Sequence, residues 1–200
     1  MSKAKRRKLD LVFVANTEVT LKDLHLPEPW LERKIREDPS VLKLGDIKVD
    51  SFQRRNKKGG RLDLLLSDEE NSTLYAAELM LGEVDESHIV RCVEYWLAES
   101  RLLEGGKSAK KEWSVVAVLA AENVRKSRYF PVIELLSQKI PLTVIEITGL
   151  KVRGYTTLKF TNIFDGQDQL EQTDAGDEDT GRKDVDRTDW AAKRPSAIRQ

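Results

Sequence analysis

The spacing of apolar residues along the chain predicts helices and strands in a regular order. Strands alternate with a period of two, whereas helices place apolar residues three or four positions apart. The polar run Asp68–Thr73 separates two apolar strands and predicts a hairpin. In chain order we expect a strand or hairpin in 9–20, a helix between 27 and 39, strands at 44–52, 61–67 and 74–81, a helix from 85 or 87 to 103, a strand at 115–121, a helix at 127–138, and strands at 142–148 and 156–161.

This order of elements predicts an α/β sandwich with a mixed central sheet. Val115–Ala121 is a continuous apolar run, which is typical of a strand covered on both faces. The first helix carries an apolar stripe made of Trp30, Leu31 and Ile35. The inward residues expected on the second helix are Ile89, Val93, Trp96 and Leu97.

Composition narrows the class of protein. The chain has 200 residues, of which 40% are hydrophobic, and 34 basic residues balance 34 acidic ones. This balance excludes a uniformly basic nucleic-acid coat and a uniformly acidic chain. The single cysteine, Cys92, excludes an internal disulfide framework and a multi-cysteine zinc site. No apolar run approaches the ~18 residues of a membrane span, and the start is a poor signal peptide, so the expected location is the cytoplasm.

The charges are clustered, and they suggest three regions. Residues 1–26 hold a basic arm and a first strand, 27–164 form the core, and 165–200 are an acidic tail that is flexible or bound to a partner. A second basic cluster lies just before the hairpin, where it could grip a nucleic-acid backbone or simply be a solvated loop. Its residues are Arg54, Arg55, Lys57, Lys58 and Arg61.

The hairpin is expected to bring two acids together. If Asp68 lies opposite Thr73, counting outward places Asp63 opposite Glu78. Opposed residues on antiparallel strands point to the same face, with Cβ atoms about 4.5–5.5 Å apart. Two such carboxylates repel unless they share a divalent cation, and their oxygens suit magnesium or manganese. The alternative is that both acids lie on a solvated sheet face.

Two runs resemble a known family. The run Gly60–Leu65 (GRLDLL), followed by Ala77–Met80 (AELM), resembles the core motif of the PD-(D/E)XK nuclease superfamily. The longer run Glu78–Trp96 is similar to the branch near the NucS-type endonuclease domain and to bacterial proteins with the pattern ELQLG-x-x-D-x-SHI-x-R-x-x-EYW. The resemblance covers roughly residues 27 to 164. It implies a restriction endonuclease-like α/β/α sandwich that hydrolyses nucleic-acid phosphodiesters, DNA rather than RNA, with Mg²⁺ or Mn²⁺ as cofactor.

Carried over by position, the resemblance implies that Asp63 and Glu78 bind the metal and that Glu32 completes the site. The motif's lysine is replaced by Met80, which cannot orient a water molecule. In one interpretation Arg61, opposite Met80 in the same register, supplies the missing cation. In the other, Met80 is a core residue and the chain is a degenerate relative that acts as a nucleic-acid-binding or assembly subunit.

The helix after the hairpin carries further candidates for phosphate contacts. His88, Arg91 and Tyr95 follow at i, i+3 and i+7 and are expected to share one polar face. The alternative is that His88 caps the helix and that Arg91 pairs with Glu94 or Asp85. A third hypothesis gives the acidic tail a regulatory role, either folded over the basic cluster or bound to a protein partner. Self-association remains open.

Overall fold

The computed structural model describes residues 14–55, 60–105, 110 and 112–170. The expected order of helices and strands is confirmed, and the boundaries agree to within a few residues. Of the element expected in 9–20, residues 9–13 lie outside the described part. The elements are β1 (Thr17–Val19), α1 (Glu28–Glu37), a 3-10 helix (Pro39–Leu42), β2 (Ile47–Arg55), β3 (Arg61–Asp68), β4 (Thr73–Met80), α2 (Glu86–Glu104), β5 (Ser114–Glu122), a 3-10 helix (Val124–Lys126), α3 (Phe130–Ser137), β6 (Leu142–Val152) and β7 (Tyr155–Phe164).

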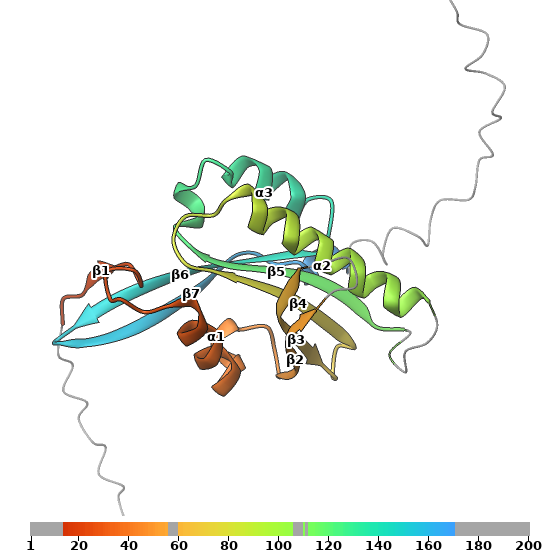
Figure 1. Ribbon diagram of the computed structural model, residues 1–200, viewed down its shortest axis with the longest axis horizontal. Coiled ribbons are helices and arrows are strands. Elements are labelled where there is room, and N and C mark those ends of the chain that lie inside the picture. The colour runs from red at the N-terminus through yellow and green to blue at the C-terminus, as the bar shows by residue number, and fades with distance from the viewer. Residues whose placement is uncertain (1–13, 56–59, 106–109, 111, 171–200) are drawn as a thin grey trace, which may run out of the picture.

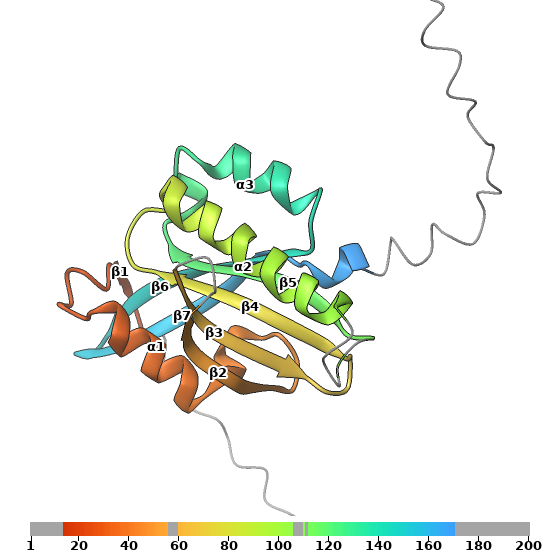
Figure 2. The same ribbon diagram turned by 45° about the vertical axis from the view of Figure 1, so that its right-hand side comes forward.

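Within the described residues, seven strands form one open mixed sheet, so the chain belongs to the α/β class. The sheet order is β1-β6-β5-β4-β3-β2, and β7 pairs with β6. Strands β2, β3 and β4 are antiparallel neighbours, whereas β4, β5 and β6 run parallel. Helix α1 lies on one face of the sheet, and α2 and α3 lie on the other (Figures 1 and 2). The core is accordingly divided between the two faces.

The hairpin of β3 and β4 has the predicted register. Asp68 pairs with Thr73, and the ladder continues to Leu64 opposite Ala77. The Asp68 carboxylate fixes the turn, because it accepts hydrogen bonds from the backbone N–H groups of Glu70 and Asn71. The hairpin therefore forms as a local unit and sets the position of every residue that follows on β4.

Helix α2 begins at the predicted capping residue, but the face that it turns towards the sheet differs from the predicted one. Asp85 accepts a hydrogen bond from the backbone N–H of His88 at 3.0 Å. The expected inward positions Val93, Trp96 and Leu97 are only half-buried, and Tyr95, expected on the polar face, is 2% exposed. The residues that the helix buries are Ile89, Cys92, Tyr95, Glu99 and Leu103.

The reason for this rotated face is the fit of the Tyr95 ring. The ring packs with Leu62 and Leu65, and its hydroxyl reaches the backbone at Gly60. A Cβ at Gly60, where φ is +84°, would lie 2.8 Å from that hydroxyl. Only glycine leaves room there, so the phenol is buried in the core and is not exposed to substrate.

The first residues of the acidic stretch pack on the sheet. The backbone N–H of Gly166 donates to the Thr143 hydroxyl at 3.0 Å, and the Gln167 amide donates to the Tyr75 hydroxyl. Leu170 contacts the core on the α1 side. The rest of the predicted tail, residues 171–200, lies outside the described part of the chain. In the described part, no helix is both long and apolar enough to span a membrane.

Glu122 at the end of β5 connects two distant segments and yields a prediction for stability. Its buried carboxylate accepts the N–H of Leu21 at 2.7 Å and the N–H of Gly82 at 2.9 Å. In Glu122→Gln an amide NH₂ faces one of these donors, so we expect the free energy of unfolding to fall by about 1–3 kcal/mol in urea titrations. The exposed Glu134, changed to glutamine, is the control and should differ little from wild type. Equal stability of both variants would contradict a structural role for Glu122.

Candidate functional site

Asp63 and Glu78 meet where β3 and β4 separate. The last paired residues of the ladder are Leu64 and Ala77, one step before the two acids. Beyond this point the backbone pairing of β3 and β4 ends. The Asp63 side chain bonds to β4 instead, since its Oδ2 accepts a hydrogen bond from the Leu79 N–H at 2.9 Å. Glu78 is completely buried and Asp63 is half-buried. The two acids therefore lie together at a fork in the sheet, as the register predicted.

Burial makes both carboxylates reluctant to ionise. Burial, followed by the negative charge of Asp63, raises the pKa of Glu78 to about 8, although the nearby Arg91 guanidinium lowers it. Burial also raises the pKa of Asp63 to about 6, against the lowering effect of the Leu79 N–H. The alternative that both acids lie on a solvated face is wrong for Glu78, which has no exposed surface, whereas Asp63 is half-buried. Perturbed carboxylates of this kind often mark functional sites.

Helix α1 brings two more acids towards the fork. The charges of Glu28 and Glu32 both raise the pKa of Asp63. Glu32 is 7% exposed and is held by Gln53, whose side-chain amide donates to Glu32 Oε2 at 2.8 Å. The charge of Glu32 therefore acts on Asp63, but in the described residues Glu32 forms no close group with Asp63 and Glu78, and its role in completing the site stays a prediction. Sequence reasoning missed Glu28 and Gln53, although the four-residue spacing of Glu28 and Glu32 already places them on one helix face.

Arg91 is the cation that contacts the acid pair. Its guanidinium forms an ion pair with Glu78 Oε1, so the expected alternative pairing with Glu94 or Asp85 is wrong. The ion pair does not satisfy the carboxylate: neither Glu78 oxygen has a hydrogen bond of ordinary geometry within the described part of the chain. The Arg91 side chain is 39% exposed, so part of it contacts solvent while its guanidinium is paired with Glu78. Buried oxygens without donors are suited to a cation.

The two carboxylates could hold magnesium or manganese if water and substrate supply the remaining ligands. In the described ranges, no three His, Cys, Asp or Glu side chains are grouped closely enough to hold a metal ion. Magnesium, however, is commonly bound through one or two carboxylates, with waters and substrate phosphates as the other ligands. Asp63 and Glu78 meet that requirement, because Glu78 Oε2 is buried without a hydrogen-bond partner among the described residues, and Asp63 accepts the Leu79 N–H through Oδ2.

Met80 and Arg61 do not form the predicted pair. Met80 is 7% exposed and packs with Val84, Ile89 and Cys92 beneath α2. The β3–β4 ladder ends before it reaches Arg61, which is exposed and pairs through its backbone with β2. Met80 is therefore a core residue, and Arg61 is not positioned by it.

Of the other residues predicted to contact nucleic acid, some are held by contacts within the protein and some lie outside the described part of the chain. His88 Nδ1 lies 2.8 Å from Asp85 Oδ1, so the His88 ring contacts the capping residue, which is Asp85 and not His88 as the alternative expected; Arg54 pairs with the buried Glu99. With Tyr95 buried as well, Arg91 is the member of the predicted polar face that reaches the acids. The backbone of Arg55 continues β2, but its side chain lies outside the described part, as do Lys57 and Lys58.

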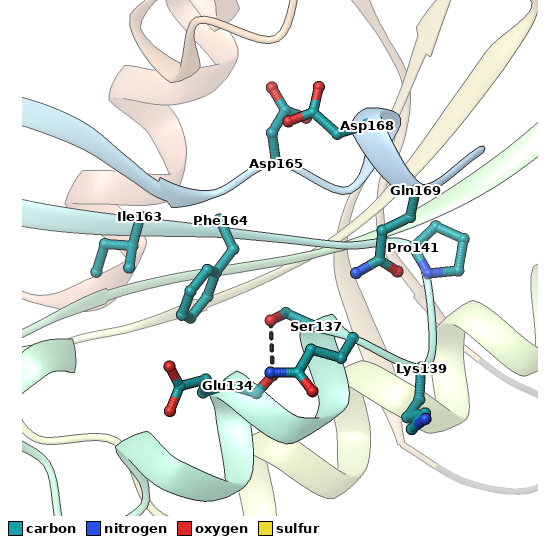
Figure 3. Close-up of a pocket in the computed structure, with 10 residues that line it drawn as sticks. Glu134, Ser137, Lys139, Pro141, Ile163, Phe164, Asp165, Asp168 and Gln169 are labelled. Carbon is teal, nitrogen blue, oxygen red and sulfur yellow. Dashed lines mark hydrogen bonds between the residues drawn. The ribbon is translucent and has the colours of Figure 1, made fainter. Parts of the chain in front are cut away.

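A pocket of about 630 Å³ lies at the end of the strands that is remote from the acid pair. It is formed between the end of α3 and the end of β7, and Figure 3 shows Glu134, Phe164 and Lys139 around it. Pro141, which precedes β6, also lines it, whereas the acid pair lies towards the carboxyl end of β4. Because β4 and β6 run in the same direction through β5, the pocket and the acid pair are at opposite ends of the strands.

No protein-family model, curated protein or solved structure matches this chain. Any proposal of function consequently rests on the fork between β3 and β4, where the buried Glu78 lies beside the half-buried Asp63 and is paired with Arg91.

Proposed function

We propose that the chain is a metal-dependent nuclease that hydrolyses phosphodiester bonds of nucleic acid, DNA rather than RNA. The observation that carries the proposal is the position of Glu78 beside Asp63. Glu78 is completely buried, its Oε1 is paired with the Arg91 guanidinium, and its Oε2 has no hydrogen-bond partner among the described residues. The three-layer arrangement around a mixed sheet supports the finer proposal of a restriction endonuclease-like, PD-(D/E)XK-type fold. Nucleic acid is the proposed partner.

The proposed cofactor is Mg²⁺ or Mn²⁺, held by Asp63 and Glu78. A bound cation of this kind polarises the scissile phosphate and lowers the pKa of an attacking water. The chain itself supplies the rest. Gln53 holds the Glu32 carboxylate near the pair, and Arg91 provides a fixed positive charge beside Glu78, where it can bind a phosphate oxygen. Arg91 thus takes the place that sequence reasoning gave to Arg61.

A second candidate function is favoured by the packing of Met80. A methionine in the core contributes no proton donor or charge at the motif's lysine position. In this alternative the chain is a catalytically degenerate protein of the same fold that acts as a nucleic-acid-binding or assembly subunit. The two candidates differ in a single measurable property, which is metal-dependent turnover.

The decisive experiment is a cleavage screen over single-stranded, duplex and branched DNA and RNA with Mg²⁺ and Mn²⁺. Asp63→Asn is the matched inactive variant, because its amide oxygen can still accept the Leu79 N–H while one metal-binding oxygen is lost. We expect cleavage by the wild type and a loss of about a thousandfold or more in Asp63→Asn. Cleavage that survives in Asp63→Asn would show a contaminating nuclease.

A wild type without turnover would favour the degenerate subunit, and Met80 then gives a direct test. If Met80→Gln or Met80→Lys creates metal-dependent cleavage where the native chain has none, the native site is degenerate. The glutamine variant is the safer one, since a lysine at this 7%-exposed position buries an ammonium group.

A further inference from the structure

A groove between α1 and β2 adjoins the acid cluster. Its volume is about 490 Å³, within the range of about 300–1,000 Å³ that small-molecule pockets occupy. Phe52, Arg33 and Arg36 line it. Strand β2 ends the sheet order, so no further described strand covers the groove on that side.

Phe52 provides an aromatic surface in this groove. The residue is 49% exposed, although an exposed phenylalanine has no polar atom to compensate for contact with water. The Arg36 guanidinium lies over the ring, 3.5 Å from its centroid, and holds it in place. The ring is therefore fixed from one side while much of its surface stays open.

The backbone of β2 is distorted where it forms this surface. The register shifts between Val49 and Ser51, and Gln53 has a φ of +47°, which is unusual for a residue with a side chain. Neighbouring strand residues normally point to opposite faces, yet Phe52 and Gln53 both contact α1, through Arg36 and Glu32 respectively. Strained backbone of this kind concentrates at functional sites.

The groove is lined by two basic and two acidic side chains, and their ion-pair partners Lys34, Lys110 and Glu32 leave an excess of one positive charge. Glu37 is shared by Lys34 at 2.6 Å and Arg33 at 3.8 Å, so two cations face one acid. Asp50 is neutralised by Lys110 at 2.7 Å. Arg36 lies 3.8 Å from Glu32 and so connects the aromatic ring to the acid cluster. This charge suits a phosphate-bearing ligand that continues into the acid site.

We infer that this groove binds one unpaired nucleobase of a single-stranded substrate, which stacks on the Phe52 ring. The phosphate next to that base lies beside Arg33 and Arg36, between the groove and the acid pair. A base can stack on a side chain only when it is not already stacked in a duplex, so the groove selects single-stranded or locally opened nucleic acid. The inference rests on the proposed function for the identity of the ligand.

The test measures binding without cleavage. A labelled single-stranded oligonucleotide and a matched duplex are titrated in EDTA at low salt, and fluorescence anisotropy reports the affinity. We expect tighter binding of the single strand, a loss of about tenfold in Phe52→Ala, and recovery in Phe52→Trp. Tyr155→Ala removes another exposed aromatic residue, at the β6–β7 turn, and should leave the affinity unchanged.

A set of oligonucleotides with a single abasic position, moved along the strand, adds a specific signature. The position that stacks on Phe52 should lose affinity for the wild type but not for Phe52→Ala. Equal affinity of Phe52→Ala and wild type, no measurable binding of single strands, or an equal Phe52 dependence for duplex would each overturn the inference. If stacking is observed but no divalent ion supports cleavage, the subsite stands and the nuclease proposal fails; cleavage without a Phe52 effect gives the reverse result.

Discussion

Replacing Glu78 by glutamine is expected to abolish metal-dependent cleavage and, at the same time, to stabilise the metal-free protein at alkaline pH. The first effect follows from the loss of a ligand oxygen and should reach about a thousandfold or more. The second follows from the buried position of the carboxyl group, whose pKa rises from 4.5 to about 8 on folding.

The direction of the pH effect follows from proton linkage. Because the folded state binds the Glu78 proton more tightly than the unfolded chain does, the resulting stabilisation is complete below about pH 4.5 and is lost as the pH rises to about 8. The loss is on the order of a few kcal/mol. Asp63, with a pKa of about 6, contributes in the same direction over a lower range of pH. Glutamine cannot ionise, so the variant should keep its stability.

The measurement is the free energy of unfolding in EDTA, from urea titrations at several pH values, for wild type, Glu78→Gln and Glu70→Gln. Glu70 is exposed on the turn of the same hairpin, and its variant should follow the wild-type pH profile. Added Mg²⁺ should stabilise the wild type more at alkaline than at acidic pH, since binding requires the ionised carboxylates. Parallel pH profiles for wild type and Glu78→Gln would contradict the burial argument.

Replacing Arg91 by methionine is expected to separate metal binding from catalysis. In the described structure the Arg91 guanidinium occupies Glu78 Oε1, so it competes with a cation for that oxygen. Its removal should leave Mg²⁺ affinity equal or higher. Cleavage should fall by about a hundredfold or more, because a positive charge preorganised beside the scissile phosphate is lost.

The two readouts are isothermal titration of Mg²⁺ and single-turnover cleavage, with Arg91→Lys and Arg101→Met alongside. Lysine keeps the charge but not the forked geometry, and should recover part of the rate. Arg101 lies exposed in the last turn of the same helix, and its variant should behave as wild type. A parallel loss of metal affinity and rate in Arg91→Met would mean that the arginine only supports the site's structure.

The sequence was sufficient for the order of elements and for the acid pair. Both depend on residues close together in the sequence. The alternation of apolar and polar residues identifies the strands, and the turn at Asp68–Thr73 sets the register in which Asp63 lies beside Glu78. The role of Glu32 in the site followed from resemblance alone, and it stays a prediction because Glu32 affects Asp63 only through its charge.

The contacts of individual side chains could not be read from the sequence. Tyr95 is buried because Gly60, which lies far away in sequence, leaves space for its hydroxyl. Arg91 reaches Glu78 because α2 crosses β4, a tertiary relation that helical periodicity alone does not contain. The role of Gln53 depends on a left-handed backbone that no propensity predicts for glutamine.

The two carboxylate oxygens of Asp63 have different roles, one in the fold and one in the proposed metal binding. Oδ2 accepts the Leu79 N–H in place of a backbone acceptor and keeps the fork in shape, and the proposed function assigns metal binding to Oδ1. An aspartate-to-asparagine change, which needs only one nucleotide substitution in the gene, would preserve the first task and end the second. Under the proposed function, this single change would remove metal binding while the fold is kept, so the residue at this position would separate an active from an inactive form of the chain.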